Sequence, residues 1–164
     1  MILLSSALEL LKNKNINMND LIIDATTDKV FLTLIKNNKN IYTSKQQNSK
    51  NNFDKLLILI EQLLDKNKIL IKDLNRIYVN RGPGSFAGIR KSLSIAKGIH
   101  VAENIDYFCF SFLDFINVEN SIKKQIIKDL SLLSQYHSIE YGEIPQLCDK
   151  YKIKKNLIKP LYLS

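Results

Sequence analysis

The first two thirds of the chain alternate between short apolar runs and longer patterns of apolar residues at helical spacing. Aliphatic residues at 21–23 predict a first strand, and alternation at 29–35 predicts a second. An extended pattern resumes at 40–43 after a polar turn, whereas 44–52 is polar and predicts a loop. Because only short connections separate these three strands, we expect them to be consecutive antiparallel strands.

Helices and strands alternate after these three strands. Apolar residues recur at helical spacing through 53–66, and two further aliphatic residues widen the stripe almost all the way round the predicted helix. Strands are predicted at 77–79 and 107–112, with a helix over 85–100 between them. The resulting order, β-β-β-α-β-α-β, predicts an α/β fold with a mixed sheet, which is the order of a ribonuclease H-like lobe.

The remainder of the chain is short. An amphipathic pattern at 119–136 and a helical piece at 143–151 precede an extended end, so the C-terminal part is expected to be mainly helical. The first residues are apolar, but Glu9 interrupts them and no basic segment precedes them, so they fit neither a signal peptide nor a membrane span. We expect an N-terminal extension or misplaced start at 1–17, a ribonuclease H-like lobe at 18–118, and a reduced C-terminal part at 119–164.

Composition changes this picture little. The formal net charge is +8, but nearly all the positive charge comes from lysines scattered through the chain, which predicts a basic surface more than a nucleic-acid site. Cys109 and Cys148 have no CxxC spacing, so we expect reduced thiols in a cytoplasmic protein. No metal and no membrane partner are expected.

The most distinctive motif joins the strand at 77–79 to the helix at 85–100. It holds three of the five glycines and one of the three prolines in ten residues, which are Arg81, Gly82, Pro83, Gly84, Ser85, Phe86, Ala87, Gly88, Ile89 and Arg90. Ser85 is placed to cap the helix, and the loop amides with the helix dipole form a candidate anion site. A tight turn without a ligand explains the same residues equally well, and the spacing of a Walker loop is absent.

Four segments of the chain resemble the bacterial TsaB (YeaZ) family, whose members have a glycoprotease-like, actin-like ATPase fold. They are the strand and turn at 21–27, the motif at 81–90, the run at 94–98 and the tail at 159–164. The likeness covers about residues 19–113 well and the extreme C-terminus weakly. The motif at 81–90 carries most of its specificity.

This resemblance implies a non-catalytic partner subunit in tRNA modification. Such a subunit pairs with a TsaD-like catalytic subunit through the helices of its first lobe, or forms a homodimer through the same surface. It supports transfer of a threonylcarbamoyl group to adenosine 37 of ANN-decoding tRNAs. A TsaE-like ATPase joins through the complex, and the subunit contacts tRNA only indirectly. No cofactor is expected except ATP or ADP at an interface of the complex.

The resemblance also places the functional residues. The pairing surface is expected on the first predicted helix, with small residues of the next helix opposite, at Phe53, Leu56, Leu57, Ile60, Leu63, Leu64, Gly88, Ser92 and Ala96. A remnant of the nucleotide side is expected at Asp24, Thr26 and Thr27. No catalytic residue is expected.

The chain departs from the family pattern at several points. Ala87 stands where the family usually has threonine, Ser92 stands where it has glycine, and no histidine precedes the helix at 53–66. Only about fifty residues follow Phe115, whereas the family carries a second lobe similar in size to the first. Because an actin-like fold encloses nucleotide between two lobes, we expect that this chain alone does not bind ATP.

A ribonuclease H-like metal-dependent nuclease is an alternative function. It needs several carboxylates around two metal ions, and Asp24 and Glu61 are suitably placed in the order of elements. The third carboxylate position, after the predicted strand at 77–79, holds Asn80 followed by Arg81, which argues against binding of two metal ions. Asp24 is more simply a turn residue whose carboxylate accepts hydrogen bonds from the amides of Thr26 or Thr27. A degenerate interaction module is a further alternative. Direct tRNA binding by a merely basic surface would show steep salt dependence without sequence preference.

Overall fold

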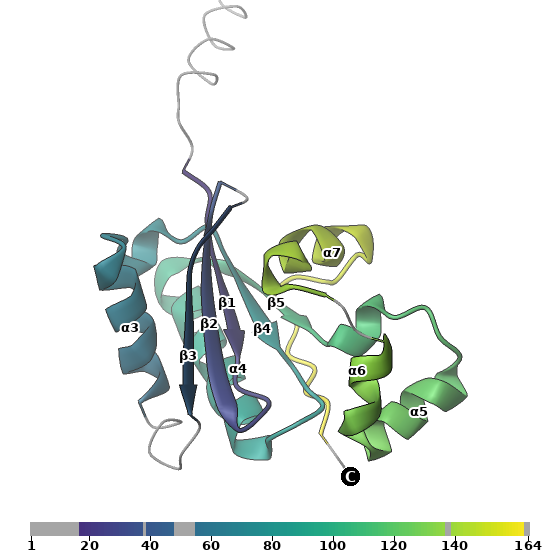
Figure 1. Cartoon of the computed structure of the whole chain (residues 1–164). Helices are drawn as coiled ribbons and strands as arrows, with labels where there is room; N and C mark the ends of the chain where they lie inside the picture. The colour runs from purple at the N-terminus through teal and green to yellow at the C-terminus, as the bar shows by residue number, and fades with distance from the viewer. Residues whose placement is uncertain (1–16, 38, 48–54, 137–138, 163–164) are drawn as a thin grey trace, which may run out of the picture.

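The computed structural model describes residues 17–37, 39–47, 55–136 and 139–162. Its centre is a five-stranded sheet in the order β3-β2-β1-β4-β5, with helices on both faces (Figure 1). The strands are β1 (Asn19–Asp24), β2 (Lys29–Lys36), β3 (Lys39–Gln47), β4 (Arg76–Asn80) and β5 (Asp106–Phe110).

The sheet is mixed, as the sequence predicts. β2 pairs antiparallel with both β1 and β3, whereas β4 pairs parallel with both β1 and β5. The carboxyl ends of β1, β4 and β5 therefore meet at one edge of the sheet, which is where α/β proteins usually place their ligands.

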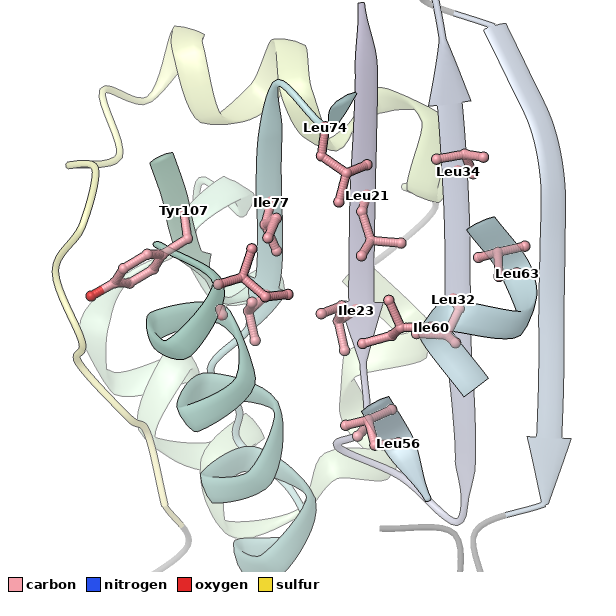
Figure 2. Close-up of a cluster of buried hydrophobic side chains, with 14 of the residues drawn as sticks. Leu21, Ile23, Leu32, Leu34, Leu56, Ile60, Leu63, Leu74, Ile77 and Tyr107 are labelled. Carbon is pink, nitrogen blue, oxygen red and sulfur yellow. The ribbon is translucent and has the colours of Figure 1, made fainter. Parts of the chain in front are cut away.

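Two long helices cover one face of the sheet. They are α3 (Leu56–Lys66) and α4 (Phe86–Glu103), and both contribute to the larger hydrophobic core (Figure 2). Alternate residues of β1 point to opposite faces, so Leu21 and Ile23 enter this core while Ile22 enters a second core on the other face.

Short helical segments cover the second face. Ile144 and Cys148, near the end of the chain, pack there against Tyr78 and Phe110 of the sheet. The segments are η2 (Phe112–Phe115), α5 (Asn120–Lys128), η3 (Leu130–Leu132), α6 (Leu133–Tyr136), η4 (Tyr141–Glu143) and α7 (Ile144–Lys150), whereas η1 (Ile71–Asp73) precedes β4.

The ends of α4 are fixed by local bonds. The Ser85 hydroxyl accepts a hydrogen bond from the Gly88 amide at 3.2 Å, which confirms the predicted N-cap. Asn104 ends the helix in the left-handed conformation, with φ of 56°.

Three predicted boundaries are wrong, each for a local reason. β3 continues to Gln47 because its pairing with β2 extends beyond the expected turn. β5 ends at Phe110 because the Ser111 hydroxyl accepts from the Leu113 amide and starts a 3-10 turn. The helix predicted at 119–136 breaks at Asp129, whose carboxylate binds the amide and hydroxyl of Ser131 in place of continuing the helix.

Two parts of the predicted organisation stay predictions. Residues 1–16 lie outside the described residues, as does Phe53. The predicted boundary at residue 118 is not tested. In the described part of the chain, every helix is too short or too polar to cross a membrane.

A carboxyl group is buried in the sheet near the start of β1. Asp20 is 5% exposed, and no hydrogen-bond donor among the described residues reaches its Oδ1. Arg76 is its register partner on β4. Burial outweighs the attraction of Arg76 and raises the pKa of Asp20 from 3.8 to about 6. The folded state therefore favours the protonated carboxyl.

Asp20→Asn is expected to stabilise the protein only at neutral pH. Because the folded pKa is raised, the stability contributed by Asp20 is full below about pH 4 and is lost as pH rises through about 6. Asparagine cannot ionise, so the variant should gain up to about 3 kcal/mol at about pH 7.5 and little at about pH 3.5. Urea unfolding at the two pH values measures this, with the exposed Asp65→Asn as control. An equal effect of Asp20→Asn at both pH values would contradict it.

Candidate functional site

The carboxylate of Asp24 ends β1 at the edge where the parallel strands terminate. The residue is 2% exposed, and four donors from the chain itself reach it. Its Oδ1 accepts from the Thr26 amide at 3.0 Å and the Thr26 hydroxyl at 2.7 Å. Its Oδ2 accepts from Asn80 Nδ2 at 3.0 Å and from the Tyr141 hydroxyl at 2.7 Å. The predicted role of Asp24 as a turn residue is confirmed for its bond to Thr26.

Tyr141 is the donor that comes from the C-terminal part. Its ring lies against Phe31 and Phe112, with centroids 5.4 and 6.0 Å away. Burial and the neighbouring charge of Asp24 raise the pKa of the Tyr141 phenol. The phenol therefore keeps its proton and remains a donor to Asp24.

The glycines of the motif at 81–90 allow the chain to approach itself closely. A β-carbon on Gly84 would collide with the carbonyl oxygen of Thr26, and the Ser85 amide donates to that same oxygen at 2.7 Å. Gly82 has φ of +109°, and a β-carbon there would collide with the carbonyl oxygen of Leu161. The contacts that require glycine come from this chain, so the loop needs no ligand to explain its composition.

The loop amides and arginines are largely occupied. Asn80 Oδ1 accepts from the Gly82 amide at 3.0 Å. The Arg81 guanidinium binds Asp114 at 2.8 Å and the Lys159 carbonyl at 3.3 Å. Arg90 is exposed and lies over the ring of Phe86, 5.3 Å from its centroid. Neither guanidinium lines the crevice beside Asp24, which weakens the interpretation of the motif as a phosphate site.

The other motif residues divide between core and surface. Ile89 is fully buried, Phe86 is 56% exposed, and Ala87 is exposed at the start of α4. Phe86 also contacts the ring of Tyr162 in the C-terminal tail, with the two centroids 4.7 Å apart. The tail therefore touches the motif at Phe86 as well as at Gly82.

A cavity of about 240 Å³ lies beside Asp24, between the strand ends and the C-terminal part. It is lined by Asp24, Thr26, Thr27, Asn80, Gly82, Pro83, Ser111, Phe112, Leu113, Leu130, Leu133 and Tyr141. Asp24, Thr26 and Thr27, predicted as the nucleotide side, are brought together here. Several of its polar groups already bond within the chain, because Asp24 accepts four donors and the Ser111 hydroxyl accepts the Leu113 amide.

The chemistry available in this crevice is narrow. Among the described residues, no three histidine, cysteine or acidic side chains gather as a metal site. Glu61 lines a different hollow, with Leu70 and Glu103, so it does not join Asp24. Both cysteines are free and buried, and burial raises the pKa of Cys109 to about 11, which keeps the thiol protonated.

The structure corrects most of the predicted pairing surface. The sequence cannot tell which side of a nearly all-apolar helix meets the sheet. In the structure Leu56, Ile60, Leu63 and Leu64 are at most 2% exposed and form the core under α3 (Figure 2). Gly88, Ser92 and Ala96 are likewise buried on α4. In this conformation none of them can meet a partner.

The exposed side of α3 carries other aliphatic residues. Leu57 is 42% exposed and remains from the predicted set, and its neighbour Ile58 is 51% exposed. The exposed side of α4 carries Gly98 and Val101, and Val101 is 76% exposed. These residues form the outer surface of the helical face.

Sequence reasoning missed Tyr141 and Asp114. Tyr141 lies 117 residues from Asp24, and no local motif marks it. Asp114 both binds Arg81 and accepts the Ser111 amide at 2.8 Å. A serine followed three residues later by an acid is a capping signature, so that spacing could have identified Asp114.

Tyr141→Phe is expected to destabilise the protein. The change keeps the ring packing but removes the donor to a buried carboxylate, which costs about 1.5–3 kcal/mol. Tyr151→Phe removes the same hydroxyl from an exposed ring and should change the free energy of unfolding little. Urea unfolding of the two variants makes the comparison. Equal stability of Tyr141→Phe and the wild type would mean that the bond contributes nothing.

Three kinds of comparison place the chain among known proteins. Residues 38–129 match the family model described as "TsaD: tRNA N6-adenosine threonylcarbamoyltransferase". A tRNA threonylcarbamoyladenosine biosynthesis protein TsaB from Buchnera aphidicola subsp. Schizaphis graminum is 35% identical over 101 residues, covering 60% of this chain and 48% of the relative. The TsaB of Buchnera aphidicola subsp. Baizongia pistaciae is 30% identical over 87 residues, covering 53% and 39%.

The fold also has a solved counterpart. YeaZ from Pseudomonas aeruginosa matches with a TM-score of 0.55 and 18% identity over 70% of this chain and 50% of YeaZ. This likeness supports the fold alone and confirms the predicted ribonuclease H-like, actin-like architecture. The chain spans about half the length of the curated relatives it matches. The family model covers more than half of the chain, so the chain belongs to the family that this model describes and, with its TsaB relatives, is a TsaB family protein.

Proposed function

We propose that this chain is a non-catalytic subunit in the synthesis of threonylcarbamoyladenosine on tRNA, and that it acts by pairing with a TsaD-like catalytic subunit. The observation that carries the proposal is the internal hydrogen bonding of the crevice at the strand ends. Its one buried carboxylate, Asp24, is bound by four donors from this chain. Family membership indicates the process. The internally bonded carboxylate favours a supporting role over a catalytic one.

The exposed side of α3 and α4 is the proposed pairing surface. Both helices pack on the same face of the sheet, whereas the C-terminal segments cover the opposite face. Leu57 and Ile58 place two large aliphatic side chains next to each other in solvent. Burying such side chains against a partner contributes about 1.5–3 kcal/mol for each.

Gly98 supports a close approach at this surface. A β-carbon at this position would meet nothing within 4 Å inside the chain. Glycine in a helix interior costs about 0.5–1 kcal/mol relative to alanine, and no internal contact explains that cost here. Contact with the backbone of a partner helix would explain it.

Other members of the assembly follow from this proposal. A TsaE-like ATPase would join through the catalytic subunit, and a homodimer would use the same face of α3 and α4. ATP or ADP would be held at an interface of the complex, because the carboxylate at the crevice of this chain already accepts four donors from the chain itself.

The metal-dependent nuclease is less well supported by the geometry. Asn80 donates its amide to Asp24, and Glu61 lies in a separate hollow. Among the described residues that line the crevice, Asp24 is the only carboxylate.

Leu57→Asp is expected to weaken pairing with the TsaD-like subunit by at least roughly tenfold, because pairing would bury an unpaired carboxylate. Gln146→Asp adds the same charge at an exposed position of α7, on the opposite face of the sheet, and is the matched control. Both variants should keep the far-UV spectrum and the unfolding free energy of the wild type. Co-purification and a binding titration with the catalytic subunit from the same cell measure the effect.

Three outcomes of this experiment are informative. Selective loss with Leu57→Asp supports the proposed surface, whereas unchanged pairing of both variants would place the surface elsewhere. A wild-type chain that does not pair at all overturns the proposed function. Leu64→Asp is no test of pairing, because Leu64 is 1% exposed in the core and its replacement should unfold the chain.

A further inference from the structure

Positive charge is concentrated near the end of the chain. Residues 150–159 contain five lysines and no acidic residue, whereas the whole chain has 24 basic and 16 acidic residues in 164. The five, here called the tail lysines, are Lys150, Lys152, Lys154, Lys155 and Lys159, and all are exposed. This density is about three times the average of the chain, so scattered lysine usage does not account for it.

The backbone that carries the tail lysines is fixed to the sheet. The backbone of Lys155 forms an isolated antiparallel β-bridge with Phe108 of β5. The Asn156 amide donates to the Tyr107 carbonyl at 2.7 Å, and the Tyr107 amide donates to Asn156 Oδ1 at 3.0 Å. Further along, the Leu161 amide donates to the Arg81 carbonyl at 2.7 Å. Fixed lysines lose less backbone entropy on binding than lysines on a loose tail.

The acids near the tail lysines are already paired, one of them with a tail lysine. Asp106 binds Lys155 at 3.3 Å, Asp114 binds Arg81 at 2.8 Å, and Asp149 lies 3.8 Å from Arg76. Of the tail lysines, only Lys155 has an ion pair within the described ranges. The other four therefore add to an uncompensated positive field.

Three of the tail lysines surround a hollow. Lys152, Lys154 and Lys159 line an open depression of about 250 Å³ whose other walls include Arg81 and Leu157. Leu157 is 48% exposed at this depression. Phosphate groups need cations, and unstacked bases need aromatic or apolar faces. Both kinds of group occur together here.

We propose that the tail lysines form a direct contact site for the phosphate backbone of RNA, and specifically of the tRNA on which the assembly acts. The choice of tRNA rests on the proposed function, whereas the polyanion site rests on the lysines themselves. The resemblance to the family predicts only indirect contact with tRNA, so this site adds to that expectation. Because the contacts are to phosphates, binding should depend steeply on salt and little on sequence.

A polynucleotide fits this surface better than a membrane does. The lysines border a concave hollow, whereas a helix that lies on a bilayer presents a flat apolar side flanked by cations.

The test compares two triple variants of the full chain. One replaces Lys152, Lys154 and Lys159 by glutamine, and the control replaces Lys68, Lys72 and Lys97, which are exposed and remove the same charge. Lys68 also matches Lys152 in backbone conformation, with φ of 55° against 54°. Binding to an unmodified tRNA transcript is followed by fluorescence anisotropy between about 50 and 200 mM salt. Vesicles containing phosphatidylserine are tested in parallel.

The tail variant should bind tRNA at least tenfold more weakly and lower the slope of log K against log salt by about 2 to 3, while the control stays close to wild type. Equal weakening of both variants would mean a diffuse basic surface and would overturn the proposal. Wild-type binding by the tail variant, no tRNA binding by the wild type, or a loss confined to vesicles would also overturn it. The pairing experiment above is independent, so each proposal can fail alone.

Discussion

The buried carboxylate of Asp24 is the constraint on which the rest of the structure depends. A carboxylate that is 2% exposed is tolerated only when hydrogen bonds replace the water it has lost. Its donors come from three places in the chain: the turn after β1, the end of β4, and the C-terminal part 117 residues away. One side chain thus ties the short C-terminal part to the ribonuclease H-like sheet.

The glycine-rich motif is held by the same turn after β1 and by the C-terminal tail. Thr26 bonds to Asp24 and also accepts the Ser85 amide, so the turn after β1 fixes the loop that starts α4. The chain end then lies over Gly82 and binds Arg81 through the Leu161 amide. Together these contacts set the position of α4 and leave its outer side, with α3, open to solvent. The bond between the Leu161 amide and the Arg81 carbonyl also fixes the tail that carries the lysines.

Much of the fold could be predicted from the sequence, because its signals are local. Strand alternation gave the order of β1 to β5, and the position of Ser85 before a helical pattern gave the N-cap. The break at Asp129 was missed, since one local bond to Ser131 overrides a good amphipathic pattern. The fold resemblance relied on the motif at 81–90 and agrees with the solved structure of YeaZ.

The site was harder to predict, because its signals are long-range. Asp24, Thr26 and Thr27 lie together at the crevice, but nothing near Tyr141 in the sequence points to Asp24. The orientation of α3 was also beyond prediction. A helix that is apolar nearly all round does not reveal which side meets the sheet, so residues such as Leu64 were assigned to the wrong side.

The most direct test of this account is a double-mutant cycle between Asp24 and Tyr141. Asp24→Asn keeps the oxygen that Thr26 needs but places an amide where Tyr141 donates. Tyr141→Phe should therefore cost much less in the Asp24→Asn protein than in the wild type, with a coupling free energy of about 1–2 kcal/mol from urea unfolding. A coupling near zero would show that the two side chains do not hold the C-terminal part to the sheet, and would contradict the account.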